Sequence, residues 1–214
     1  MFIYCQNKRF VVKPQMSFSF SDYPDKESCA VVVYFCGCLH HCKGCQNLEL
    51  QRFSSEWSPT SSELIKVIAS ECRKAHTKKV VFSGGDCVYQ NTMLLNYVID
   101  KLKSMHDIDV CIYTGFEIKK IISLGITGAA FYKCGLFDET KRDSILQGKT
   151  DTELRFATKN QKLYNSKYKL VSVDNVYYFR KRDRIIAKFK KAFSFLFRFR
   201  KVNKDAQIKE MPKK

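Results

Sequence analysis

The sequence predicts an α/β protein whose sheet consists mainly of parallel strands. Four short apolar runs, rich in β-branched and aromatic residues, occur in the first two thirds of the chain. Such runs are typical of strands that are buried on both faces of a sheet. Stretches with the helical spacing of apolar residues separate these runs, and a helix between two strands favours parallel pairing. We therefore expect four to six mainly parallel strands with helical crossovers.

Length and composition place the chain among globular proteins. Its 214 residues are 45% hydrophobic and 14% aromatic, which suits one domain with a core and an appendage. No apolar run reaches the ~18 residues that a membrane span requires. The N-terminus carries Lys8 and Arg9 but no apolar segment typical of a signal peptide. Ten cysteines without such a signal favour a reducing compartment, so we expect a cytoplasmic protein with free or metal-bound thiols.

The N-terminal part leads into the first buried strand. Residues 1–25 are aromatic and polar, and short strands are expected at residues 2–4 and 9–12. The continuous apolar run at residues 29–35 predicts the first core strand. A cysteine-rich loop at residues 36–47 follows directly. It should therefore lie at the carboxyl edge of the sheet, where α/β proteins place their ligand sites.

Three more strands alternate with three helices. Thr60 and Glu63 form a capping box that begins a helix reaching about residue 76. Further strands are predicted at residues 79–82, 110–113 and 129–132, and further helices at residues 91–105 and 116–124. Each strand ends in a polar or glycine-bearing turn. Because the carboxyl ends of parallel strands share one edge, these turns should converge on the cysteine loop.

The pattern changes after Asp138. Short strands or loops are expected at residues 154–157, 158–161 and 169–172, and a hairpin across Asp174 and Asn175 leads into residues 176–179. Most of the net charge of +17 comes from residues 180–214. We divide the chain into residues 1–165 as the core with an N-terminal extension, residues 166–201 as a C-terminal hairpin and helix, and residues 202–214 as a disordered tail.

The expected C-terminal helix, residues 181–200, is amphipathic, basic and rich in phenylalanine. Its apolar residues recur at helical spacing, and arginine and lysine fill most other positions. Three roles are open for it. The stripe packs on the sheet, which is the preferred interpretation; or the helix lies on an anionic membrane; or it docks a partner or an RNA.

The cysteine loop carries the first chemical motif, Cys38-x3-Cys42-x2-Cys45. Three thiolates on one short loop can hold three irons of a cubane iron–sulfur cluster and leave the fourth iron open for a ligand. Two alternatives remain. Cys36 and Cys38 with His40 and His41 could form a zinc knuckle, or the cysteines could simply be buried.

The turn after the second core strand, Ser83-Gly84-Gly85-Asp86, carries the second motif. Two glycines let the backbone approach a ligand closely, and an aspartate can accept hydrogen bonds from an ammonium group. Gly-Gly-Asp alone is more often a plain turn. Beside a cluster with an open iron, however, it suits S-adenosylmethionine (SAM), whose amine and carboxylate could chelate that iron.

These motifs, in this order, resemble those of radical SAM proteins, in particular the activating enzymes of the anaerobic (class III) ribonucleotide reductase. The resemblance covers most of the first ~165 residues. Besides the two motifs above, it rests on Tyr113-Thr114-Gly115-Phe116, on the turn of residues 132–137, and on residues 158–164. The chain departs from the pattern at Leu136, where a proline is common, at Lys159 and Lys162, and in its basic helix.

The resemblance implies a partial (βα) barrel and a radical reaction. A [4Fe-4S] cluster on Cys38, Cys42 and Cys45 would reduce SAM, and the resulting 5′-deoxyadenosyl radical would form a glycyl radical on the large reductase subunit. A flavodoxin-like or other low-potential donor would supply the electron. The SAM-binding residues would be Gly44, Gln46, Gly84, Gly85, Asp86, Thr114 and Lys133. Alternatives are a radical SAM enzyme with another substrate, or a zinc or nucleic-acid-binding module.

Overall fold

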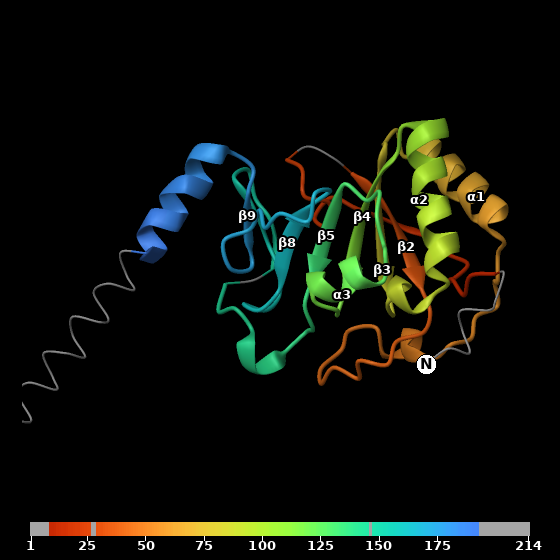
Figure 1. Ribbon diagram of the computed structural model, residues 1–214, viewed down its shortest axis with the longest axis horizontal. Helices are drawn as coiled ribbons and strands as arrows, with labels where there is room; N and C mark the ends of the chain where they lie inside the picture. Colours follow the sequence, from red (N-terminus) through yellow and green to blue (C-terminus); the bar gives the residue numbers. More distant parts are fainter. Residues whose placement is uncertain (1–8, 27–28, 146, 193–214) are drawn as a thin grey trace, which may run out of the picture.

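The computed structural model describes residues 9–26, 29–145 and 147–192 (Figure 1). Its centre is a six-stranded sheet in the order β1-β2-β3-β4-β5-β8. Four neighbouring strands are parallel: β2 (Ala30–Phe35), β3 (Lys79–Gly84), β4 (Asp109–Thr114) and β5 (Phe131–Cys134). The edge strands β1 (Ser17–Ser19) and β8 (Lys162–Asn165) are antiparallel to their neighbours. The expected mainly parallel α/β sheet is confirmed.

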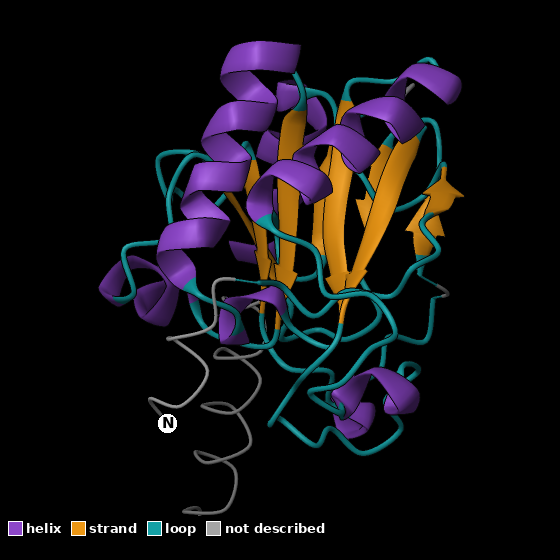
Figure 2. Cartoon of the chain, turned by 90° about the vertical axis from the view of Figure 1, so that its right-hand side faces the viewer, coloured by secondary structure: helices purple, strands orange, loops and turns teal. Residues whose placement is uncertain are grey.

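Helices α1 (Ser61–Lys74), α2 (Thr92–His106) and α3 (Ile118–Ser123) connect the parallel strands. The strand order in the sheet follows the chain order, so right-handed crossovers put all three helices on one face, as Figure 2 shows. The capping box of α1 is confirmed, because the Thr60 side chain accepts from the Glu63 amide and the Glu63 carboxylate accepts from the Thr60 amide.

The opposite face of the sheet carries a smaller core and a second sheet. Tyr23, from the segment after β1, packs there against Val32 and Val81. The second sheet has the order β6-β7-β9 and consists of β6 (Gly148–Lys149), β7 (Glu153–Arg155) and β9 (Val176–Tyr178). Leu154 and Phe156 from this part pack against residues of β4 and β5. The carboxyl edge of the parallel strands is therefore walled on one side by the C-terminal region.

Several sequence-based expectations fail in detail. Residues 9–12 form no strand; Val12 makes only isolated bridges, to Phe35 and Trp57. Residues 169–172, expected as a strand or loop, form a loop with one bridge to Tyr164. The turn at Asp174 and Asn175 forms, with Val173 and Val176 bonded across it, but β9 pairs with β7 along its length. Three short 3-10 helices were not expected: η2 (Leu48–Gln51), η3 (Cys87–Tyr89) and η4 (Glu139–Lys141). The strand expected at residues 2–4 lies outside the described residues.

The C-terminal helix runs from residue 181 to residue 192, the last described position, and extends away from the sheets in Figure 1. The expectation that its apolar stripe packs on the sheet is wrong for these residues, since Ile185, Ile186 and Phe189 are 42%, 45% and 73% exposed. The rest of the expected helix and the tail of residues 202–214 lie outside the described residues. No helix in the described ranges is long and apolar enough to cross a membrane.

Candidate metal centre

The cysteine loop, residues 36–47, leaves the carboxyl end of β2 and returns into η2. Backbone bonds close it: the Gly37 amide donates to the Leu50 carbonyl at 2.8 Å, and the Cys38 amide donates to the Gln51 carbonyl at 3.0 Å. Gly37 has a φ of +100°, and a Cβ atom there would lie 2.3 Å from the Phe53 ring. Only glycine fits this position, so the turn that aims the first cysteine is fixed by backbone geometry.

The three predicted cluster ligands, Cys38, Cys42 and Cys45, line one cavity of about 360 Å³. Cys38 is buried, and the other two are half-buried. Burial raises the pKa of the Cys38 thiol to about 11 and also raises the pKa of Cys42. Thiols in such surroundings stay protonated at neutral pH until a metal replaces the proton. A cationic cluster that displaced these protons would therefore be a suitable partner for the three thiols.

The arrangement of these thiols suits a cluster better than a single zinc ion. Zinc needs four side chains that converge on one point at about 2.0–2.3 Å. Among the described residues, no three His, Cys, Asp or Glu side chains converge in this way. A cubane cluster instead binds each thiolate to a different iron, which fits cysteines spaced around a cavity. Cys36 is buried outside this cavity, and its carbonyl accepts from Gln90 Nε2 at 2.9 Å.

Gly84 and Gly85 join the cavity wall directly to the cysteine loop. A Cβ atom on Gly84, whose φ is +104°, would lie 2.4 Å from the Phe35 carbonyl oxygen. A Cβ atom on Gly85 would lie 2.5 Å from the Leu50 carbonyl oxygen. The Asn47 side-chain amide also donates to the Gly84 carbonyl at 3.2 Å. The sequence predicted a close approach of these glycines to a ligand; the structure shows a close approach to the backbone of the neighbouring loop, which holds the two loops together.

Asp86 lies behind this wall and is only 1% exposed. Its Oδ2 accepts from Thr114 Oγ1 at 2.8 Å and from the Gly115 amide at 2.9 Å, and it pairs with His40 Nε2 at 3.0 Å. Its Oδ1 accepts from the Val88 amide at 3.0 Å. These contacts occupy the carboxylate and tie three loops together. The geometry gives Asp86 a structural role. An ammonium group of a ligand would have to bind to other atoms of the cavity wall.

Lys133, at the end of β5, lines the opposite side of the cavity. Its Nζ lies 5.0 Å from the centre of the Tyr113 ring and 5.9 Å from that of Phe156. Burial lowers the pKa of Lys133 to about 8, because the rings and the sheet remove water from the ammonium group. A ligand carboxylate placed here would restore the solvation that burial removes.

The remaining predicted residues divide into lining and supporting positions. Gln46 and Thr114 line the cavity. Gly44 does not line it; its φ is +73°, and a Cβ atom there would meet the Phe137 ring at 3.3 Å. Sequence reasoning did not name Tyr34, near the end of β2, and Phe137, in the turn after β5, as lining residues. It also missed lining residues from segments that carry no strand-end signal: Ser21, Asp22, Gln147, Phe156 and Ala157. Arg155 and Gln161, which had no physical assignment, also line it.

Comparison with known proteins locates the similarity in this part of the chain. The model of a family described as "4Fe-4S single cluster domain" matches residues 27–163. The chain is also similar to the anaerobic ribonucleoside-triphosphate reductase-activating protein of Enterobacteria phage T4, with 28% identity over 110 residues. That alignment covers 48% of this chain and 67% of the phage protein. The resemblance indicated by the motifs is confirmed.

Proposed function

The chain belongs to the family of 4Fe-4S single cluster domains, and we propose that it is a radical SAM activase of an anaerobic ribonucleotide reductase. The observation that carries this proposal is the shared cavity, which brings together three thiols, the two glycines after β3 and the lysine at the end of β5. The name of the phage T4 relative supports the reductase as partner. In this proposal the parallel sheet forms the partial barrel of a radical SAM fold.

Cys38, Cys42 and Cys45 hold the cluster in the proposed enzyme. When bound, the [4Fe-4S] cluster and SAM supply the redox chemistry: one electron cleaves the sulfonium C–S bond, and the radical formed removes a hydrogen atom from a glycine of the partner. The protein holds the cluster and SAM in position and keeps water away from them. Burial of Cys38 and the rings of Tyr34, Tyr113, Phe137 and Phe156 around the cavity limit the access of water.

SAM binds between the two walls of the cavity. Gly84 and Gly85 line the cavity without side chains, so their backbone atoms can contact the ligand, while their close packing on Phe35 and Leu50 fixes the position of this turn. Lys133 binds the SAM carboxylate from the other side. Gln46 and Thr114 complete the lining, and Gly44 and Asp86 act by holding the loops in place.

A protein substrate is supported by the mouth of the cavity. Leu39, Leu48 and Leu136 are 51%, 63% and 41% exposed, and each lies next to a lining residue or within the cysteine loop. Exposed leucines from two segments, the cysteine loop with η2 and the turn after β5, mark a surface that a macromolecule can cover. The glycine-bearing segment of the reductase docks on these leucines. A flavodoxin-like or other low-potential donor supplies the electron, in the cytoplasm.

One anaerobic preparation tests the proposal. The protein is reconstituted with iron and sulfide, reduced, and mixed with SAM and then with the reductase. We expect thiolate-to-iron absorption in the visible range, release of 5′-deoxyadenosine, and a glycyl-radical EPR signal on the reductase. A cluster and 5′-deoxyadenosine without the EPR signal would point to a radical SAM enzyme with another substrate. Tight binding of zinc without formation of a cluster would exclude the proposed radical SAM activity.

A further inference from the structure

The outer side of the helix at residues 181–192 carries an apolar stripe that no other described residues cover. Ile185 and Phe189 lie one turn apart on this side and are 42% and 73% exposed. Arg182 lies on the same side, and its side chain is 78% exposed. Large apolar side chains that recur along one face and stay in water mark an interaction surface.

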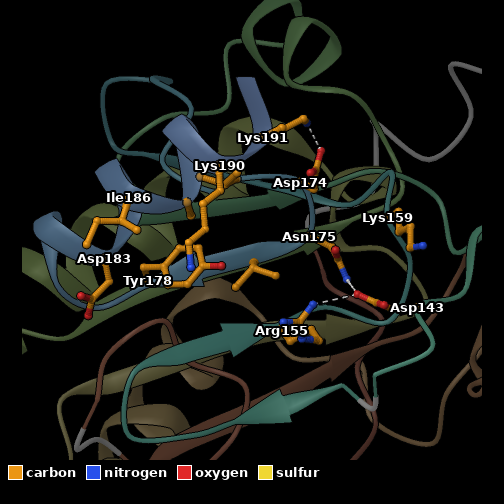
Figure 3. A pocket seen from close by; sticks show the side chains of 13 residues that line it. Asp143, Arg155, Lys159, Asp174, Asn175, Tyr178, Asp183, Ile186, Lys190 and Lys191 are labelled. Atoms are coloured by element: carbon orange, nitrogen blue, oxygen red, sulfur yellow. Dashed lines mark hydrogen bonds and ion pairs between the residues drawn. The ribbon is translucent and has the colours of Figure 1, made fainter. Parts of the chain in front are cut away.

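The inner side of the same helix faces the second sheet. A hollow of about 610 Å³ separates the two and is lined by Tyr178, Asp183 and Lys190, as Figure 3 shows. An ion pair between Lys191 and Asp174 joins the helix to the turn before β9. Ile185 and Phe189 do not line this hollow. The inner side of the helix thus carries Asp183, Lys190 and also Ile186, whereas Ile185 and Phe189 lie outside the hollow.

The helix is also strongly cationic. Residues 180–192 contain seven basic residues and one acidic residue: Arg180, Lys181, Arg182, Arg184, Lys188, Lys190 and Lys191, against Asp183. Lys181 and Lys188, which flank the apolar stripe, take part in none of the ion pairs formed within the described ranges. Their charges are available to an external anion.

An anionic bilayer uses both properties of this surface, whereas a nucleic acid or a neutral protein groove uses only one of them. A nucleic acid would pair with the cations through its phosphates but would leave Ile185 and Phe189 in water. A neutral apolar groove on a protein would cover these two side chains but would leave the cations unmatched. At an anionic bilayer, acyl chains and negative headgroups lie side by side, so both requirements are met.

We propose that the helix at residues 181–192 docks the protein on an anionic lipid surface. Ile185 and Phe189 insert between the acyl chains, and the flanking lysines and arginines lie at the level of the headgroups. Basic residues occur along the whole of this segment and keep its polar side at the level of the headgroups, so the helix lies in the plane of the membrane. No residue of the cavity takes part, so this inference stands or falls independently of the proposed activity.

Sedimentation of the full chain with lipid vesicles tests the apolar contact. We expect binding to phosphatidylcholine vesicles that contain about 30 mol % phosphatidylserine, no binding to phosphatidylcholine alone, and release at raised salt. The double variant Ile185→Asp, Phe189→Asp should lose binding while it stays folded, because both side chains are exposed. Met93→Asp on α2 is the matched control, since Met93 is 77% exposed and should be dispensable.

A second pair of variants tests the charge. Lys181→Gln with Lys188→Gln should lower the vesicle partition coefficient about fivefold for each charge removed. Lys66→Gln with Lys119→Gln removes two exposed charges elsewhere and should change little. Equal binding to neutral vesicles, or binding that survives the aspartate substitutions, overturns the proposal. So does retention by RNA or by the reductase subunit in the absence of any binding to the anionic vesicles.

Discussion

The two walls of the cavity use their polar groups in opposite ways. On the inner wall, the cysteine loop and the turn of residues 83–86 bind each other: amides and carbonyls pair across the loops, and Asp86 accepts from its neighbours. On the outer wall, the ammonium group of Lys133 has aromatic rings as neighbours and forms no hydrogen bond or ion pair with any described residue. The polar groups of the inner wall are therefore paired with each other, whereas the Lys133 ammonium group on the outer wall can still bind an anion.

This difference indicates that the inner wall fixes the shape of the cavity and that the outer wall binds the ligand. A wall whose polar groups are already paired has a fixed shape and gains little by adding a ligand. A buried ammonium group without a counter-ion costs stability and gains much when an anion arrives. We therefore expect substitutions in the inner wall to reduce stability, and substitution of Lys133 to reduce ligand affinity while stability increases.

The largest effect is expected from the cluster ligands themselves. Cys38→Ala, Cys42→Ala and Cys45→Ala should each abolish retention of the iron–sulfur cluster, because each removes the only thiolate for one iron. Iron and sulfide content and the visible spectrum after anaerobic reconstitution measure this. Cys36→Ala is the control and should retain the cluster. Loss of the cluster in Cys36→Ala alone would show that the ligands are assigned wrongly.

Gly85→Ala tests the close contact in the inner wall by itself, because Gly85, unlike Gly84, does not have a left-handed φ. The new methyl group would lie 2.5 Å from the Leu50 carbonyl oxygen and 2.8 Å from that of Gly37, so backbone must move. We expect a loss of more than about 3 kcal/mol in the free energy of unfolding. Gly125→Ala, where no atom lies within 4 Å, should cost only about 1 kcal/mol, from its φ of +65°. Equal losses in urea denaturation would contradict the close contact.

Asp86→Asn sharpens the contrast with Lys133. The amide keeps the size of the side chain but replaces a carboxylate that accepts from Thr114, Gly115 and Val88. We expect a loss of about 2–4 kcal/mol in the apoprotein, because buried donors lose a charged acceptor. Asp100→Asn on the exposed side of α2 should change the free energy by less than about 0.5 kcal/mol. A stable Asp86→Asn variant with weakened SAM binding would show that Asp86 contacts the ligand directly.

Lys133→Met should have the smallest effect on stability, with the opposite sign. The pKa of Lys133 is lowered from 10.5 to about 8, so the folded state disfavours the charged form. The variant should be about 1 kcal/mol more stable at pH 7. The cost in the native protein falls as pH rises through about 8 toward 10.5, so the advantage of the variant should shrink over that range. Thermal unfolding between pH 7 and pH 10 measures it.

The same variant should bind SAM at least about tenfold more weakly at pH 7, because it lacks the ammonium group that we propose as the partner of the SAM carboxylate. In the native protein, SAM affinity should decline as pH rises above about 8, whereas the variant should show no such decline. Lys162→Met, an exposed lysine on β8, is the control. Unchanged affinity in Lys133→Met would assign Lys133 to packing against Tyr113 and Phe156.

Sequence reasoning found the inner wall and part of the outer wall for one physical reason. The carboxyl ends of parallel strands share an edge, so the residues after β2, β3, β4 and β5 had to meet there, and Cys38, Gly84, Thr114 and Lys133 do line one cavity. Adjacency along an edge does not say which way a side chain points. Asp86 follows the two glycines directly, yet it turns away from the cavity toward its backbone donors.

The parts that were not predicted depend on contacts between distant segments. Asp22 and Phe156 reach the cavity from segments that lie on the face of the sheet opposite the helices. No local periodicity in the sequence predicts this position. The C-terminal helix shows the same limit. Its spacing predicts an apolar stripe at Ile185 and Phe189, but spacing cannot tell whether a sheet or an external surface covers that stripe.

The backbone closure of the cysteine loop has a consequence for repair after exposure to oxygen. The bonds from Gly37 to Leu50 and from Cys38 to Gln51 involve no thiol, so they persist when a cluster is oxidised and lost. The loop then stays folded, with Cys38 still facing the cavity. We therefore expect the apoprotein to take up iron and sulfide without refolding.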